Sequence, residues 1–224
     1  MDSGSLKGGL IVSCQAQPGS PLRDVAIMVA MARAAQLGGA VGLRVNGPED
    51  IAAIHAAVPL PMIGIYKQDL DGFDVRITPT LEAARDLVQA GADILAIDAT
   101  DRPHPNGRTS AQLIQLCKAE FHVPIMADVS TLPEGIAAAE AGADIVATTL
   151  SGYTPYSRQL ETPDFELIAE LAASVSVPII TEGRIATPED ARRALDLGAF
   201  AVVVGTAITR PEWITQRFVE GMKA

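Results

Sequence analysis

The chain has 224 residues, of which 48% are hydrophobic and 20% are charged, so it carries enough apolar side chains to bury a core and is not a disordered chain. Its 27 acidic residues outnumber its 17 basic ones, and the net charge of −10 disfavours nucleic acid and anionic membranes as partners. Neither a signal-peptide pattern nor a run of about 20 apolar residues is present. We therefore expect a cytoplasmic protein whose two cysteines, Cys14 and Cys117, are reduced and buried.

Four segments share one pattern, in which a helix end is followed by a glycine and then by an apolar strand. They recur about every 50 residues, at 35–45, 88–100, 139–150 and 195–206. A second set of apolar segments, each beginning with Val-Pro, alternates with the first set, at 58–67, 123–129 and 177–183. Together with the apolar residues near the start of the chain, these segments give eight candidate strands.

The candidate strands alternate with helical patterns throughout the chain. In order, the strands are expected near residues 10–14, 40–44, 61–66, 93–98, 124–128, 144–149, 178–182 and 200–204. Helices are expected between them, for example at 21–38, 80–91 and 187–198, the last with Thr187 as its N-cap and Gly198 after its end. Strands that are apolar on both faces are typical of a parallel sheet covered by helices, and eight such strands close a barrel. The sequence therefore predicts an α/β fold, a TIM (β/α)8 barrel.

No shift in composition marks a domain boundary, so a single catalytic domain is expected over 1–224. Three longer connections follow the third, fourth and sixth strands, at 68–80, 101–108 and 151–164. The first of them is predicted to contain a short extended stretch at 75–78. All three lie at the end of the barrel where the strands end, and (β/α)8 enzymes carry their active sites there.

Polar residues follow or close most of the apolar strands at this end. In strand order they are Gln15, Arg44, Lys67, Asp98, Asp128, Thr148, Thr149, Glu182 and Gly205. Lys67 and Glu182 directly follow apolar strands and are the leading catalytic candidates, with a solvated lysine and a structural partner of an arginine as the alternatives. Arg44 is interpreted as a ligand of a substrate oxygen, or else as part of an ion pair. For Asp98 and Asp128, a chemical role and the support of a neighbour are equally open.

A phosphate site is predicted in the loops after the seventh and eighth strands, where many barrels bind a phosphoryl group through backbone N–H groups. Gly183 and Gly205 allow close approach of the backbone, and Arg184 or Arg210 would add positive charge.

The sequence does not predict a metal or cofactor site. The three histidines have no metal-ligand spacing, and no nucleotide-binding or serine-hydrolase motif is present. Tyr153 and Tyr156, in the loop after the sixth strand, are expected to line a substrate pocket instead.

Nine segments form an ordered set of motifs that extends from near residue 9 to the C-terminal helix. They are IVSCQA (11–16), GLRVNG (42–47), IGIYK (63–67), ITPT (77–80), AIDAT (96–100), MADVSTLPEG (126–135), TTLSGYTPYS (148–157), EGRI (182–185) and VVGTAITRP (203–211). This set resembles the bacterial N-acylglucosamine-6-phosphate 2-epimerases. The resemblance implies an isomerase that interconverts N-acetylmannosamine 6-phosphate and N-acetylglucosamine 6-phosphate at C2, in the catabolism of sialic acid and amino sugars.

The resemblance also implies roles for individual residues. Lys67 and Glu182 correspond to an acid–base pair, and the implied substrate contacts come from Gln15, Arg44, Asp128 and Arg210. It further implies a homodimer and the absence of any metal or organic cofactor. Thr206 departs from the pattern, because some members have a second glycine at this position in the phosphate loop.

Barrel geometry independently supports an opposed pair of groups. The third and seventh strands are four apart in a ring of eight, so Lys67 and Glu182 are expected on opposite walls of the barrel. Epimerisation at C2 of the open-chain sugar requires loss of a proton from one face and its return to the other, and the C1 aldehyde acidifies that proton. Lys67 has to be neutral to accept a proton, and burial or a neighbouring arginine would lower its pKa.

Three other functions remain open from the sequence. A Schiff-base aldolase also uses a lysine at a strand end of a barrel. A phosphosugar sensor would keep the phosphate loops, although binding alone does not require an opposed acid and base. Another phosphosugar-binding barrel isomerase or synthase is the third alternative.

Overall fold

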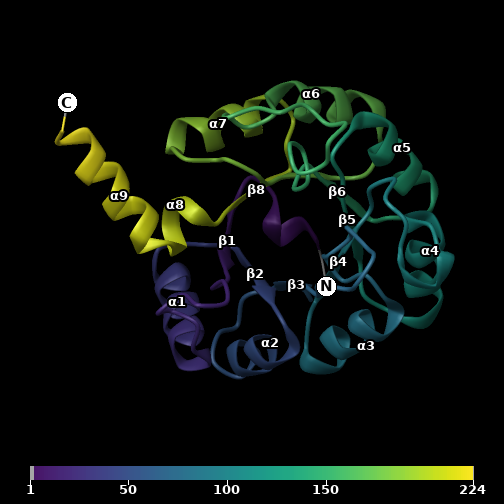
Figure 1. Ribbon diagram of the computed structural model, residues 1–224, viewed down its shortest axis with the longest axis horizontal. Helices are drawn as coiled ribbons and strands as arrows, with labels where there is room; N and C mark the ends of the chain where they lie inside the picture. Colours follow the sequence, from purple (N-terminus) through teal and green to yellow (C-terminus); the bar gives the residue numbers. More distant parts are fainter. Residues whose placement is uncertain (1–2, 224) are drawn as a thin grey trace.

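The computed structural model describes residues 3–223 as a closed ring of eight parallel strands surrounded by helices (Figure 1). The strands are β1 (Leu10–Cys14), β2 (Gly42–Asn46), β3 (Met62–Ile65), β4 (Ile94–Asp98), β5 (Ile125–Asp128), β6 (Ile145–Ala147), β7 (Ile179–Thr181) and β8 (Ala201–Val204). β1 pairs with both β2 and β8, so the sheet has no free edge. The predicted TIM-barrel fold is confirmed.

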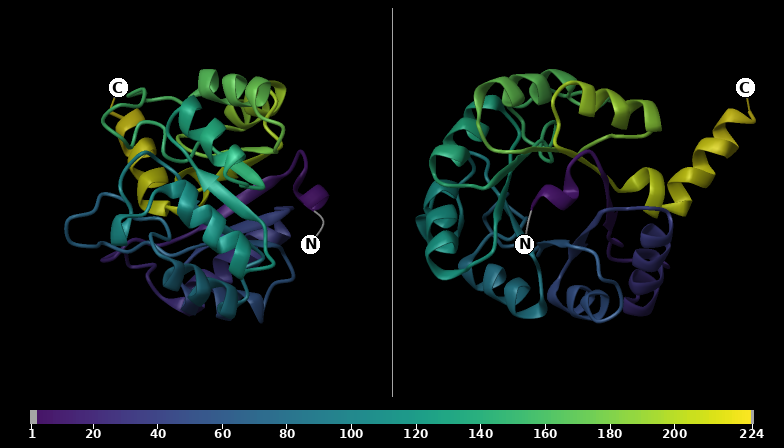
Figure 2. Two further views of the ribbon diagram at one scale, coloured as in Figure 1. Left: turned by 90° about the vertical axis from the view of Figure 1, so that its right-hand side faces the viewer. Right: turned by 180° about the vertical axis from the view of Figure 1, so that it is seen from behind.

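Helices form the outer layer, and one short helix covers the end of the barrel at which the strands begin (Figures 1 and 2). They are η1 (Ser3–Leu6), α1 (Val25–Leu37), α2 (Pro48–His55), α3 (Leu81–Ala90), η2 (Pro105–Gly107), α4 (Ser110–Glu120), α5 (Leu132–Glu140), α6 (Phe165–Ser174), α7 (Pro188–Asp196), α8 (Thr206–Thr209) and α9 (Pro211–Gly221). η1 lies across the centre of the barrel, and its Leu6 is buried among the interior side chains. Within residues 3–223, no helix has the length and apolar character needed to cross a membrane.

α7 shows how the sequence sets a helix boundary. The Thr187 hydroxyl accepts a hydrogen bond from the Asp190 backbone N–H at 3.1 Å, and the Asp190 carboxylate accepts one from the Thr187 N–H, which together make a capping box. Gly198 follows the helix with a φ of 102°, which favours glycine. Both predicted end residues of this helix are confirmed.

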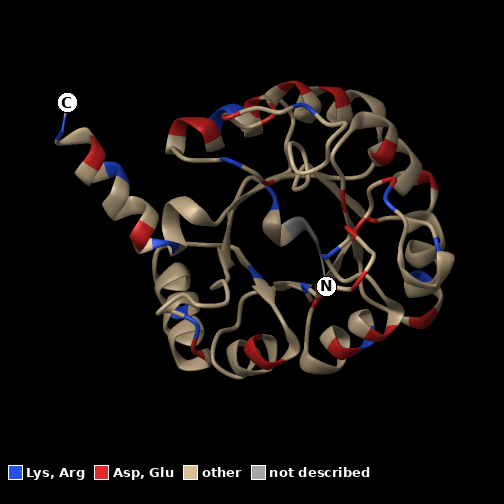
Figure 3. Ribbon diagram, in the orientation of Figure 1, with Lys and Arg blue, Asp and Glu red and all other residues tan. Residues whose placement is uncertain are grey.

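Side chains alternate along each strand between the barrel interior and the surrounding helices. In β3, Ile63 and Ile65 belong to the apolar cluster inside the barrel, whereas Met62 belongs to the cluster between the strands and the helices. The same alternation turns Arg44 and Asp128 inward, where they meet each other. Charged side chains otherwise lie mostly on the outer helices (Figure 3).

The predicted position of the second strand was wrong by two residues. β2 begins at Gly42 and not at residue 40, so Arg44 is its central residue and not its last. The apolar run continues through Val45, and the strand ends before Gly47, which has a φ of 89°. Arg44 therefore lies inside the barrel and not on its rim.

The connection after β3 folds back on itself. Lys67 and Ile77 form an antiparallel bridge, and the Thr78 backbone N–H donates to the Tyr66 carbonyl at 2.9 Å. The predicted extended stretch at 75–78 is confirmed only around Ile77, because Thr78 has a φ of 48° and is not extended. Because the Asp98 N–H also donates to the Ile77 carbonyl, at 2.8 Å, this stretch ties the backbone around Lys67 to the end of β4.

Candidate functional site

A buried arginine joins two carboxylates at the C-terminal end of the barrel, which we call the mouth. The two terminal nitrogens of Arg44 donate to the two carboxylate oxygens of Asp128 at 3.1 and 2.6 Å. Nη1 also lies 3.0 Å from Oε2 of Glu182. Arg44 is 1% exposed and Asp128 0%, whereas the Glu182 side chain is 17% exposed. Glu182 is therefore the member of this group that a molecule entering the mouth can reach.

Glu182 experiences opposing electrostatic effects. Burial raises the pKa of its carboxyl group and is the largest effect, while the positive charge of Arg44 lowers it and the negative charge of Asp128 raises it. The balance is a pKa above the ordinary value of 4.5. A carboxyl group of this kind keeps its proton to a higher pH than an ordinary glutamic acid does.

Lys67 lies two residues after the end of β3 and is held at both its backbone and its side chain. Its backbone N–H donates to Oδ1 of Asn46 at 2.8 Å, and its Nζ donates to Oε1 of Gln15 at 2.8 Å. Although the residue is exposed at the mouth, removal of water by nearby protein atoms is the main cause of a lowered pKa, and the charge of Arg44 lowers it further. The structure thus favours loss of the Lys67 proton below the ordinary pKa of 10.5.

Two residues in the hydrogen bonds around this lysine, Ser13 and Asn46, were not among the sequence candidates. Gln15 donates from its own side-chain nitrogen to the Ser13 hydroxyl at 2.7 Å, so Ser13, Gln15 and Lys67 form a hydrogen-bonded chain. Asn46 ends β2 and holds the Lys67 backbone. Asn46 would have been found as a polar strand end if that strand had been placed two residues later.

The end of β6 connects the two carboxylates on its neighbours. The Thr149 hydroxyl donates to Oδ1 of Asp128 at 2.6 Å and lies 3.5 Å from Oε2 of Glu182. The Thr148 hydroxyl donates to the Glu182 carbonyl at 2.9 Å, and the Glu182 N–H is 3.2 Å from the same hydroxyl. These contacts fix both the backbone and the side chain of Glu182.

Asp98 lies in a separate network. Its carboxylate accepts from the Thr100 hydroxyl at 2.6 Å and from Arg102 at 2.7 Å, and the residue is fully buried. Its backbone pairs in register with Asp128, but its hydrogen bonds lead to the loop after β4. Of the two roles left open for Asp98, this arrangement favours support of a loop.

The residues predicted to bind phosphate are at the mouth, but both arginines are paired with protein groups. Gly183 has a φ of 114°, and a Cβ added at Gly205 would lie 3.2 Å from the Cβ of Ser13. Arg184 donates to the Ser151 carbonyl at 2.8 Å. The guanidinium of Arg210, which is 39% exposed, donates to Glu212 at 2.9 Å.

Tyr153 is exposed in the loop after β6, and the Arg184 guanidinium lies 4.9 Å from the centre of its ring. Among the described residues, 3–223, no three His, Cys, Asp or Glu side chains are grouped so that they could hold a metal ion.

The fold and the site define a class: a (β/α)8 barrel with a lysine of lowered pKa and a glutamate of raised pKa at its mouth. A family model described as "Putative N-acetylmannosamine-6-phosphate epimerase" matches residues 28–224. The chain belongs to this family.

Relatives from several bacteria match almost the whole chain. One from Caldanaerobacter subterraneus subsp. tengcongensis is 54% identical over 97% of this chain and 92% of its own length. One from Cutibacterium acnes is 47% identical over 98% of this chain and 96% of its own length. Both carry the name "Putative N-acetylmannosamine-6-phosphate 2-epimerase".

Two solved structures place the fold among known barrels. The N-acetylmannosamine-6-phosphate 2-epimerase from Clostridium perfringens superposes with a TM-score of 0.93 at 48% identity, covering 96% of this chain and 94% of that one. A thiamine phosphate pyrophosphorylase from Pyrococcus furiosus superposes with a TM-score of 0.63 at 17% identity, covering 98% and 95%. The second similarity shows the fold alone.

Proposed function

We propose that the protein interconverts N-acetylmannosamine 6-phosphate and N-acetylglucosamine 6-phosphate by moving the proton at C2. The observation that carries this proposal is the position of Lys67 and Glu182, which end strands four apart in the ring and have pKa values shifted toward neutrality from opposite sides. The family membership and the names of the relatives support the choice of substrate.

In the proposed reaction, the sugar opens and exposes a C1 aldehyde beside C2. One of Lys67 and Glu182 takes the C2 proton from its face, an enediolate-like intermediate forms, and the other returns a proton to the opposite face. Arg44 stabilises the ionised form of Glu182 and disfavours the charged form of Lys67. The same cation therefore favours the unprotonated form of both groups, which is the form that can accept the C2 proton.

Substrate contacts are proposed at two depths of the mouth. Gln15 and Tyr153 are placed to meet the sugar, since Gln15 bonds Lys67 and Tyr153 is 61% exposed. Arg44 and Asp128 lie deeper and are buried. We therefore propose that they act mainly by holding Glu182 and setting its pKa, and less by touching the sugar.

The 6-phosphate is proposed to bind at the loops after β7 and β8. Gly183 and Gly205 allow the backbone to approach it, and Arg184 and Arg210 supply positive charge nearby. For Arg210 to bind the phosphate, its side chain exchanges Glu212 for the phosphate oxygens.

Proton NMR in D2O with N-acetylmannosamine 6-phosphate tests the proposed reaction. Epimerisation by proton exchange places deuterium at C2 of the product, and addition of a chelator leaves the rate unchanged, because no metal or cofactor is proposed. Borohydride treatment in the presence of substrate separates the aldolase alternative, since covalent trapping at Lys67 would identify a Schiff base. An inactive protein that releases no epimer would refute the proposal.

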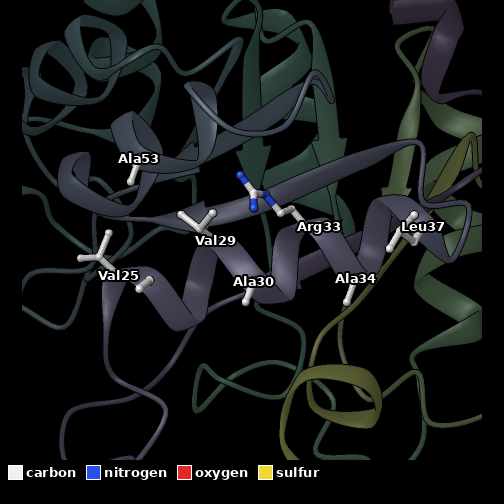
Figure 4. Close-up of a pocket in the computed structure, with 8 residues that line it drawn as sticks. Val25, Val29, Ala30, Arg33, Ala34, Leu37 and Ala53 are labelled. Atoms are coloured by element: carbon white, nitrogen blue, oxygen red, sulfur yellow. The ribbon is translucent and has the colours of Figure 1, made fainter.

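A homodimer is proposed from two exposed apolar surfaces. α9 leaves the helical ring and extends away from the barrel (Figures 1 and 2), and none of its residues is buried. Phe218 on this helix and Met222 directly after it are 71% and 85% exposed. A groove of about 760 Å³ on α1 is lined by Val25, Val29, Leu37 and other mostly apolar side chains (Figure 4). A second copy of the chain would cover both surfaces.

We further propose a cytoplasmic location and a role in the catabolism of sialic acid and amino sugars. No nucleic-acid or membrane partner is proposed, since the chain carries a net charge of −10 and many of its acidic residues lie on the outer helices (Figure 3).

A further inference from the structure

The buried carboxylate of Glu134, in the first turn of α5, accepts five hydrogen bonds from three different loops. The residue is 2% exposed. Its Oε2 accepts from the Ser130 N–H and hydroxyl, both at 2.7 Å, and from the Thr131 N–H at 2.9 Å. Its Oε1 accepts from the Asp101 N–H and from the Tyr156 hydroxyl, both at 2.9 Å.

The two oxygens of Glu134 have different roles. The Oε2 contacts include the reciprocal bond of a capping box with Thr131, so they are explained by the start of the helix. The Oε1 contacts are not needed for capping, because Asp101 belongs to the loop after β4 and Tyr156 to the loop after β6. This second oxygen links loops that border the mouth.

The loop after β6, residues 151–164, is held on two sides. On one side, Tyr156 bonds Glu134, and the Thr154 hydroxyl donates to the Ser130 hydroxyl at 2.9 Å. On the other side, Arg184 donates to the Ser151 carbonyl. Tyr153, the proposed wall of the sugar pocket, lies between these attachments.

We propose that Glu134 is a positioning residue for the epimerase reaction, which fixes the loop 151–164 through Tyr156 so that Tyr153 stands at the sugar pocket. This inference rests on the proposed function. It assigns a role to Glu134 and Tyr156, which lie in the motifs MADVSTLPEG and TTLSGYTPYS but do not belong to the proton-transfer group. Because the two residues act on the wall of the pocket, their loss affects substrate binding more than proton transfer.

The variants Tyr156→Phe and Glu134→Gln test this role, with Glu140→Gln as the matched control on the same helix. Tyr156→Phe removes one hydroxyl from a half-exposed residue, so the fold is retained. We expect the KM for N-acetylmannosamine 6-phosphate to rise about tenfold, the ratio that corresponds to one hydrogen bond to a charged group, with a smaller change in kcat. Glu140→Gln keeps wild-type kinetics.

A double-mutant cycle shows whether the two residues act together. If Tyr156 acts through Glu134, the double variant has the same kcat/KM as Glu134→Gln alone. The proposal would be overturned if the losses in kcat/KM of the two single variants multiplied in the double variant. It would also be overturned if Tyr156→Phe had the wild-type KM.

Trypsin cleavage after Arg158 supplies a readout that does not depend on activity. We expect both variants to be cut in the loop 151–164 faster than the wild type and Glu140→Gln, because the loop opens more often. If the wild type had no epimerase activity but the two variants were still cut faster than it, the proposed reaction would be refuted. The role of Glu134 in fixing the loop 151–164 would still stand. Equal cleavage of all four proteins would refute the positioning role itself.

Discussion

In the proposed reaction, Lys67 and Glu182 act on C2 from different strands, so each is expected to be necessary for net epimerisation. General acid–base groups contribute about 10²–10⁴-fold to a rate. Lys67→Ala and Glu182→Gln are therefore expected to lose at least about 10²-fold in kcat with a small change in KM, measured with the phosphorylated sugar. Lys7→Ala, which alters an exposed lysine near the chain start, is the control.

The isotope pattern of these variants distinguishes one base from two. With two bases, a single variant still exchanges deuterium into the epimer whose C2 hydrogen faces the surviving residue, without inversion. NMR in D2O measures this exchange for each epimer separately. Near-wild-type epimerisation in both variants would contradict the opposed pair.

The pKa shifts of Lys67 and Glu182 predict a pH profile of kcat/KM that is narrower than the range between the ordinary pKa values of a glutamic acid and a lysine. The proposed reaction needs one of Lys67 and Glu182 protonated and the other unprotonated, so activity falls when the pair gains a second proton or loses its last one. Glu182 has a pKa raised above 4.5, so the acid limb lies above that value, and Lys67 has a pKa lowered below 10.5, so the alkaline limb lies below that value. Initial rates measured as a function of pH locate both limbs. An acid limb at or below pH 4.5, or an alkaline limb at or above pH 10.5, would contradict the two pKa shifts.

At this scale the sequence predicted that Lys67 and Glu182 lie at the mouth together with several polar neighbours, but it did not predict Ser13 and Asn46 among those neighbours. Lys67 and Glu182 stand out because a charged residue directly after an apolar strand has few structural explanations. Ser13 and Asn46 are small polar residues of ordinary type, and their importance depends on which way each side chain faces. That direction follows from the strand register, which the sequence alone does not supply.

At the scale of elements, the loops after β7 and β8 are expected to make activity depend on the 6-phosphate. A charge-assisted hydrogen bond contributes about 1.5–3 kcal/mol. Arg210→Ala is therefore expected to raise the KM for the phosphorylated sugar about 10- to 100-fold. Activity on N-acetylmannosamine is expected to be low and to be the same in the variant and the wild type. Steady-state kinetics with both sugars checks this, and Arg192→Ala, which changes an exposed ion-paired arginine on α7, is the control. An unchanged KM would remove Arg210 from the phosphate site.

The elements themselves were largely predictable, and the one displaced strand shows the limit. The segment from Ala40 to Val45 is apolar apart from Arg44, so hydrophobicity does not mark where β2 starts. Its position is fixed by pairing with β1, in which Ile11 lies opposite Gly42. The contact of Arg184 with Ser151 was likewise not predictable, because it joins two loops that are distant in sequence.

For the molecule as a whole, α9 is expected to determine the oligomeric state. The exposed Phe218 and Met222 are unfavourable in water, and covering them stabilises a pair of chains. The full-length protein is expected to have the mass of a dimer in size-exclusion chromatography with light scattering, and a chain ending at Arg210 the mass of a monomer. A full-length monomer would refute the proposed homodimer.

Closure of the barrel also sets an order of events during synthesis. Leu10 of β1 pairs with Val202 of β8, so the first strand waits for the last before both of its edges are paired. At about 5–20 residues per second, the ribosome needs on the order of 10 to 40 seconds to make the intervening chain. Throughout that time the nascent protein carries an open, apolar sheet edge of the kind that aggregates. Ribosome-bound chains that stop before β8 are therefore expected to be digested quickly by protease, and chains released after β8 to resist it. Equal resistance of both would mean that the incomplete barrel already protects itself.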